Sequence, residues 1–398
     1  MLTDASLVVI PLLAVLAPLL ARGIGRWLPI PIVVFELVLG IIVGPDVLGW
    51  AQSSEFLEIL SEVGLAMLFF VAGSEIDASS LRGRTGRRAI TGWILSLALG
   101  LAAGWIIAPG EAAIIIGVAL SSTALGTLLP ILRDAGELRT PFGKSVGAIG
   151  AVGEFGPLIA ISVFLGSRNP GASTIVLTIF VVIAALSAWY ASRTPQGALH
   201  RFVSASLHTS GQFGVRVVLL ILAALATLSI ALDLDMLLGA FAAGIIWRIM
   251  MRDASKTDQE AVESKIEALA FGFLVPIFFI YTGVTFNLQA LLDTPILFAF
   301  VPVVAIVLLL VRGLPSVLAA PAGSSARDRT AVVLMGATGL PIIVAVTAIG
   351  VDAEILSPAV ASVLVGAGML SVLVYPLVAM AVRHTQVDAD AVAFDERM

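Results

Sequence analysis

The sequence predicts an all-α polytopic membrane protein with about 13 transmembrane helices. Composition is the first indication: the 398 residues are 59% hydrophobic and 12% charged, and the mean hydropathy is +1.08, which exceeds what a soluble core requires. The second is that apolar stretches long enough to cross a bilayer follow one another along the chain. We therefore expect a single membrane domain over residues 1–398.

Hydropathy places the expected spans along the whole chain, although Gly and Pro interrupt several of them. They cover residues 5–21, 28–44, 56–74, 89–108, 111–132, 142–166, 172–191, 214–231, 234–250, 266–285, 295–319, 330–350 and 356–382. The first span follows Asp4 rather than a basic region, which indicates a retained helix and no cleaved signal peptide. Residues 384–398 are expected to form a short cytoplasmic tail, with no regulatory domain appended in this chain.

Basic residues gather in alternate loops. One set of loops holds all 22 Lys and Arg residues except Arg168 and Arg312, whereas the opposite loops are mostly acidic. By the positive-inside rule the basic side is cytoplasmic, so we expect the N-terminus outside and the C-terminus inside. The net charge of -5 is spread over loops and tail, so the lipid bilayer is an expected partner and nucleic acid is not.

One acidic residue lies in the middle of an apolar segment. Glu154 is the only charged residue between Lys144 and Arg168, which places it about 15 Å from the nearer helix end at a rise of ~1.5 Å per residue. An acidic group at that depth usually faces an aqueous cavity and marks an ion or proton pathway. The alternative is a protonated carboxyl that only hydrogen-bonds a neighbouring helix.

Arg312 is the basic counterpart, because it lies within the apolar stretch 301–321. A guanidinium stays charged, so its burial requires a carboxylate, a set of backbone carbonyls or water. Snorkelling of the side chain toward the cytoplasmic end near Ala326 is the alternative.

Two spans combine hydroxyl residues with Gly or Pro. Residues 118–130 contain Ser122 and Thr123 at mid-span, and residues 332–346 contain Thr338 close to Pro341. This pattern favours local unwinding, which exposes backbone groups to a cavity. Close packing through small residues explains either segment alone. As the fifth span of each half, on either side of a linker helix at 172–191, the pair indicates a transporter built from inverted repeats.

Four segments carry a family resemblance: IPIVVFELVLGIIVGPDVLG (30–49), LSEVGLAMLFFVAGSEID (60–77), GVALSSTALGTLLPILRDAGEL (117–138) and AVGEFGPLIAI (151–161). In order and spacing they resemble the cation/proton antiporter-2 family, whose members exchange sodium or potassium for protons. The resemblance implies the sodium/proton antiporter fold, with two crossing broken helices and an elevator-like movement. It also implies core helices at 88–168 and 294–383, scaffold helices at 1–80 and 214–293 that form a homodimer, and a bacterial or archaeal plasma membrane.

The resemblance also implies site residues. Glu154 looks like the carboxylate that binds the proton or the metal ion, Na+ or K+, with Ser122, Thr123 and Thr338 in the crossing stretches. Arg312 looks like the buried cation that stabilises the core. Gly153 stands where many relatives carry a polar residue.

Protons and metal ions exclude one another at a single carboxylate. Because Gly153 adds no second carboxylate, we expect one proton per monovalent cation, which is electroneutral exchange. Glu36, near mid-span, is a complication: it could pair with Arg312, line the cavity or titrate as a second group.

Other functional classes are less favoured. No phosphate-binding loop and no nucleophile, base and orienter set occurs, so we expect neither an enzyme nor a cofactor, and the absence of cysteine excludes thiolate metal sites. A sodium-coupled organic-anion symporter on a similar fold and a nontransporting membrane scaffold or sensor remain as alternatives. Sodium and potassium are not distinguished by the sequence.

Overall fold

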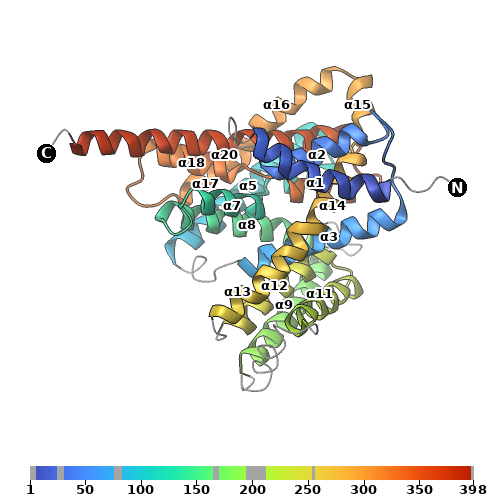
Figure 1. Ribbon diagram of the computed structural model, residues 1–398, viewed down its shortest axis with the longest axis horizontal. Helices are drawn as coiled ribbons and strands as arrows, with labels where there is room; N and C mark the ends of the chain where they lie inside the picture. Colours follow the sequence, from blue (N-terminus) through green and yellow to red (C-terminus); the bar gives the residue numbers. More distant parts are fainter. Residues whose placement is uncertain are drawn as a thin grey trace. The chain divides into compact units, whose positions relative to one another are not determined.

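The computed structural model describes residues 6–24, 31–75, 83–164, 170–193, 212–252 and 256–395 (Figure 1). These residues contain helices, turns and irregular segments but no strand, which confirms the predicted all-α class. Ten segments among them are long and apolar enough to cross a membrane. Three shorter apolar helices, Ile32–Val43, Gly171–Ser187 and Met236–Met251, fall on three further expected spans.

The helices follow the expected spans in order. They are α1 (Ser6–Ile24), α2 (Ile32–Val43), α3 (Glu55–Glu75), α5 (Arg84–Ile107), α6 (Glu111–Leu120), α7 (Leu125–Asp134), α8 (Pro141–Phe164), α9 (Pro170–Arg193), α11 (Phe213–Ala231), α12 (Met236–Met251), α13 (Lys256–Leu269), η1 (Ala270–Leu274), α14 (Val275–Val284), α15 (Leu288–Asp293), α16 (Ile296–Leu308), η2 (Leu309–Gly313), α17 (Leu314–Ser316), η3 (Val317–Ala319), α18 (Ala326–Gly336), α19 (Pro341–Asp352) and α20 (Pro358–Asp395).

The helices group into two compact units. The first comprises Met1–Ala14, Gln52–Ile76 and Leu158–Tyr281. Within it, α12 packs along both α3 and α11. A Cβ on Gly73 would run into the carbonyl of Phe241, so the missing side chain lets α3 and α12 approach closely, as small residues do in membrane proteins.

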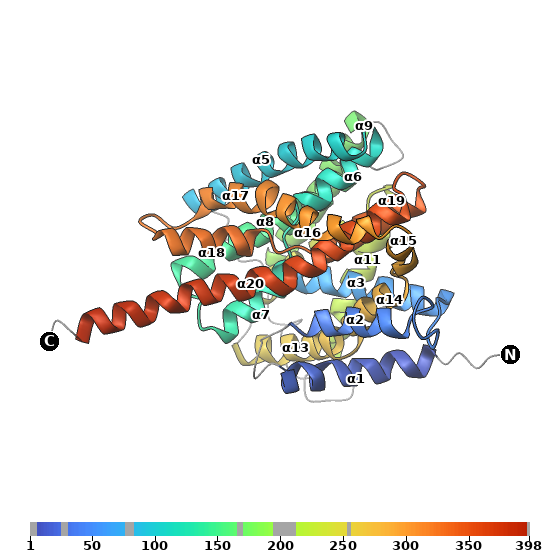
Figure 2. The ribbon, with the colours of Figure 1, turned by 90° about the horizontal axis from the view of Figure 1, so that it is seen from above.

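The second unit comprises Val15–Ala51, Asp77–Pro157 and Thr282–Met398, and it contains all the predicted site residues. Within it α5 packs along α6, and α18 and α16 pack along α20, the long helix drawn in red in Figure 2. At the contact between α5 and α6, a Cβ on Gly100 would lie 2.6 Å from the carbonyl oxygen of Gly117. The assignment of scaffold and core helices describes which helices move, and it stays a prediction.

Both predicted helix breaks are present. The helix α6 ends at Leu120 and α7 begins at Leu125, while α18 ends at Gly336 and α19 begins at Pro341. The hydroxyl of Ser121 donates to Val118 O at 2.9 Å, which satisfies one of the carbonyls that the end of α6 leaves open. Proline suits the start of α19 because its missing N–H would have no helical partner there.

One local feature was not predicted. The span that carries Arg312 contains a π-helical turn, Leu309–Gly313, so the backbone is wider where the guanidinium leaves it. Such turns are frequent at functional sites, although hydropathy does not reveal them.

Candidate functional site

The two interrupted helices cross within the second unit, at residues 121–124 and 337–340. The backbone N–H of Ala124 donates to Thr338 O at 2.8 Å, and the Thr123 hydroxyl donates to Gly336 O at 2.6 Å. These two bonds join segments more than two hundred residues apart in the sequence. The predicted pair of crossing broken helices is therefore confirmed.

The crossing brings helix ends of opposite polarity together. The carbonyl ends of α6 and α18 and the amide ends of α7 and α19 all lie at the two interrupted stretches. Carbonyl ends carry a partial negative charge and amide ends a partial positive charge. Bonds between the stretches satisfy some of these groups, and the remaining ones give a buried polar lining with no net charge of its own.

The predicted hydroxyl residues are buried at this crossing. Ser122, Thr123 and Thr338 each have 0% of their surface exposed. Ser122 donates to Ala119 O at 2.8 Å, and Thr338 donates to Leu334 O at 3.2 Å. Since each hydroxyl uses its hydrogen on a backbone carbonyl, the oxygens of Ser122 and Thr338 keep lone pairs that are able to face a cation, whereas the oxygen of Thr123 also accepts a bond from Arg312.

A further serine, Ser371 on α20, holds the second interrupted stretch. Its hydroxyl donates to Gly368 O at 2.7 Å and accepts from the N–H of Gly339 at 3.1 Å. Sequence reasoning did not single out Ser371. The sequence signal that could have identified it is that Ser371 is a polar residue within the last apolar span.

Arg312 is buried, with 1% of its surface exposed, and its guanidinium reaches the crossing. Its Nε donates to the Thr123 hydroxyl at 2.7 Å and its Nη2 donates to Ile149 O on α8 at 2.9 Å. The side chain is therefore held inside the unit and does not snorkel toward the helix end. Among the described residues, its partners are a carbonyl and a hydroxyl and do not include a carboxylate.

Gly153 gives this guanidinium its space. A Cβ at this position would lie 2.5 Å from Arg312 Nη2 and 2.6 Å from Thr123 Oγ1. Any side chain would therefore displace one or both groups. The glycine that replaces the polar residue expected from the family resemblance is required by the position of Arg312.

Glu154 follows Gly153 directly and has 1% of its surface exposed. The carbonyl of Gly153 accepts from the N–H of Thr123 at 2.9 Å, so the backbone beside Glu154 is fixed to the first interrupted stretch. A carboxylate in this buried position is costly to leave charged unless a cation or a proton accompanies it.

Glu36 lies on α2 and has 5% of its surface exposed. In the part of the chain that the structure describes, no hydrogen bond or ion pair joins Glu36 to Arg312. Of the roles expected for Glu36, pairing with Arg312 is therefore not observed. The other two, lining the cavity or titrating as a second group, stay predictions.

The chain is similar to a known family of membrane proteins over most of its length. The family described as "Sodium/hydrogen exchanger, transmembrane" matches residues 12–382. The chain belongs to the sodium/hydrogen exchanger family. The chain is 31% identical to the Na(+)/H(+)-K(+) antiporter GerN of Bacillus cereus over 287 residues, which are 69% of this chain and 71% of GerN.

More distant relatives agree with this family. The chain is 26% identical over 330 residues to YjbQ of Bacillus subtilis; the matched region is 78% of this chain but only 52%, about half, of the relative's length. The sodium proton antiporter MjNhaP1 of Methanocaldococcus jannaschii superposes with a TM-score of 0.68 at 16% identity, covering 94% of this chain and 96% of that chain. That similarity shows a shared fold, in agreement with the predicted antiporter fold.

Proposed function

We propose that this exchanger is a secondary antiporter that carries a monovalent cation, Na+ or K+, in one direction and H+ in the other. The observation that carries the proposal is a buried carboxylate, Glu154, whose neighbour Gly153 accepts a hydrogen bond from Thr123 at the crossing of the two broken helices. Membership of the family supports the exchange of ions for protons, and the name of GerN supports both cations.

The chemistry is competition for one anionic group. The Glu154 carboxylate takes either a proton or a cation, because a bound cation lowers the affinity for the proton and the reverse also holds. Alkali cations are hard ions that prefer oxygen ligands. The hydroxyl oxygens of Ser122 and Thr338, the one remaining lone pair of Thr123 and the backbone carbonyls of the crossing supply such ligands.

Movement of the crossing as a unit supplies alternating access. Arg312 bonds to Ile149 and Thr123, and Thr123 bonds to Gly336, so these bonds connect α8 with both interrupted helices. We infer that this group of helices shifts as one body against a dimeric scaffold formed by 1–80 and 214–293. A charged Glu154 opposes the shift because carrying a carboxylate across the apolar layer is unfavourable unless a proton or a cation accompanies it.

The exchange is proposed to be electroneutral. Gly153 contributes no titrating side chain, and the Arg312 guanidinium keeps its charge throughout the cycle. One carboxylate then carries either one proton or one monovalent cation. The basic loops, on the side proposed to be cytoplasmic, orient this exchange in the membrane.

The test is proton flux in everted membrane vesicles, with Na+, K+ and Li+ added in turn. We expect Glu154→Gln to abolish cation-dependent proton flux, because the amide neither titrates nor carries charge. Glu111→Gln is the matched control, since Glu111 is an exposed carboxylate at the start of α6 and outside the crossing. Unchanged flux in Glu154→Gln would refute the site, and sodium-driven uptake of an organic anion without proton movement would indicate a symporter instead.

A further inference from the structure

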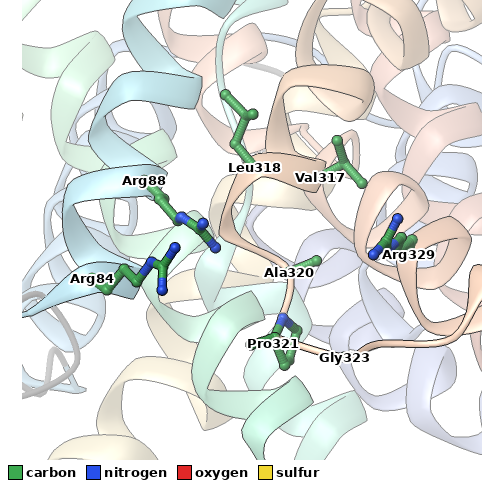
Figure 3. Close-up of a pocket in the computed structure, with 9 residues that line it drawn as sticks. Arg84, Arg88, Val317, Leu318, Ala320, Pro321, Gly323 and Arg329 are labelled. Atoms are coloured by element: carbon green, nitrogen blue, oxygen red, sulfur yellow. The ribbon is translucent and has the colours of Figure 1, made fainter.

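A cavity of about 380 Å³ in the second unit contains none of the residues of the crossing (Figure 3). It is lined by the start of α5, by the end of the span that carries Arg312, by the loop that follows it and by α18. Its charged lining residues are three arginines: Arg84, Arg88 and Arg329. No Asp or Glu is among the lining residues.

The three arginines come from two sides of one loop. Arg84 and Arg88 are four residues apart on α5 and therefore share a helix face, while Arg329 lies in the first turns of α18. Figure 3 shows the loop around Ala320 and Pro321 between Arg329 and the other two arginines. Three cationic side chains thus line one open pocket, with Arg84 and Arg329 exposed and Arg88 half-buried.

This positive charge is not balanced within the part of the chain that the structure describes. No ion pair there joins Arg84, Arg88 or Arg329 to a carboxylate. The nearest acid in the sequence, Asp328, bonds instead to Arg383 on α20. Like charges that gather without a counter-charge repel one another, so an anion in the cavity relieves an unfavourable arrangement.

The donor chemistry selects the class of anion. Guanidinium groups present forked N–H donors that match the oxygen geometry of phosphate. A volume of about 380 Å³ admits a phosphate group and a few attached atoms. Val317 and Leu318 form an apolar wall beside the arginines, which suits a phosphate that carries a hydrocarbon part.

We propose that this cavity binds the phosphate group of a compound with a net negative charge. All three arginines belong to the loops expected on the cytoplasmic side, where phosphate is present both in anionic lipid headgroups and in soluble compounds. The proposal concerns binding alone and does not depend on the transport function proposed above.

The experiment measures binding to the purified full chain in detergent micelles, with three probes. They are short-chain phosphatidylglycerol, short-chain phosphatidylcholine and inorganic phosphate. The test variant is the double substitution Arg88→Gln and Arg329→Gln. The control is Arg87→Gln and Arg327→Gln, because Arg87 and Arg327 are exposed arginines of the same two helices that do not line the cavity.

We expect phosphatidylglycerol or inorganic phosphate to bind the parent chain and the control double variant equally. The cavity double variant should bind about tenfold more weakly, because two of three charged donors are removed. Binding of phosphatidylglycerol alone assigns the site to a lipid headgroup, and binding of inorganic phosphate assigns it to a soluble compound. Three results would overturn the proposal. The first is equal binding of phosphatidylcholine and phosphatidylglycerol without any binding of inorganic phosphate. The others are no binding of any probe, and equal weakening of binding in both double variants.

Discussion

The Nε of Arg312 donates a hydrogen bond of 2.7 Å to the hydroxyl of Thr123, which in turn donates to Gly336 O at 2.6 Å. A permanent charge on one span is thereby connected through one hydroxyl to both interrupted helices. Hydrogen bonds polarise one another in such a chain, and the low dielectric of the interior strengthens each of them. The integrity of the crossing should therefore depend on Arg312.

Replacement of Arg312 tests this dependence. We expect Arg312→Gln to destabilise the chain by about 2–4 kcal/mol, because two charge-assisted bonds to Thr123 and Ile149 are lost from a buried site. Arg312→Lys should lose less, since the charge remains while the fork of donors does not. Thermal unfolding in detergent measures both effects, and Arg87→Gln, an exposed change, is the control. An Arg312→Gln chain as stable as the control would contradict the role of the crossing bonds.

Gly153 offers a second test, because its missing side chain leaves room for the same guanidinium. We expect Gly153→Ala to destabilise the chain by about 1–3 kcal/mol, because the new methyl group would crowd Arg312 Nη2 and Thr123 Oγ1. If the role of Gly153 is structural, the loss of stability should exceed any change in ion selectivity. Unfolding temperature and the relative rates with Na+ and K+ measure the two effects.

Gly147 provides the matched control on the same helix. An ideal Cβ at Gly147 has nothing within 4 Å, so Gly147→Ala should leave stability unchanged or raise it slightly through the better helix propensity of alanine. Equal stabilities of the two alanine variants would show that the close approach at Gly153 is easily relieved.

The sequence anticipated the fold well, for a physical reason. A bilayer demands long apolar spans and internally satisfied backbone, so hydropathy located the helices and the Ser, Thr, Gly and Pro residues located both breaks. Glu154 and Arg312 were singled out as candidates because charged groups are rare at such depth, and their roles stay predictions. These signals are local in the sequence.

What could not be predicted depends on contacts between distant segments. The sequence allowed Arg312 a carboxylate, carbonyls or water, and only the fold brings Ile149 O and Thr123 to it. Likewise, the sequence showed only that Gly153 adds no second carboxylate, whereas in the structure its missing side chain makes room for a guanidinium from another span. The π-helical turn at Arg312 has no signature in hydropathy.

Competition between proton and cation gives a prediction about pH. If both ions use the Glu154 carboxylate, the apparent KM for the cation should rise about tenfold for each unit by which the pH falls below the pKa of the site. The maximal rate should change less. Initial rates in proteoliposomes, measured over a range of cation concentrations at several pH values, test this, and a KM independent of pH would exclude a shared site.

Stoichiometry gives a separate prediction about voltage. With Glu154 as the only exchanging carboxylate, transport in proteoliposomes should neither generate a membrane potential nor respond to one. Clamping the potential with valinomycin and K+, for Na+ as the transported ion, should leave the rate unchanged. A rate that follows the imposed potential would point to a second titrating group, and Glu36→Gln would then be expected to abolish that response.

An ion-pair cluster on α20 gives the last prediction. Arg383 donates to Glu137 Oε1 from Nη2 at 2.6 Å and from Nε at 3.2 Å, it bonds to Asp328, and its guanidinium lies 3.9 Å from the ring centre of Phe142. These contacts tie α20 to the start of α18 and to the loop between α7 and α8. Because the pairs form a network with only 15% of the Arg383 side chain exposed, they should exceed the small contribution of an isolated surface pair.

We therefore expect Arg383→Ala to lower stability by about 1–3 kcal/mol, through the loss of both ion pairs and of the contact with Phe142. Raising the salt concentration should reduce the difference between the parent and Arg383→Ala, because screening weakens the pairs in the parent alone. Thermal unfolding at low and high salt measures both effects. Arg139→Ala is the control, since Arg139 is exposed and forms no ion pair with another described residue. If Arg383→Ala loses no more stability than this control, the ion-pair cluster contributes little.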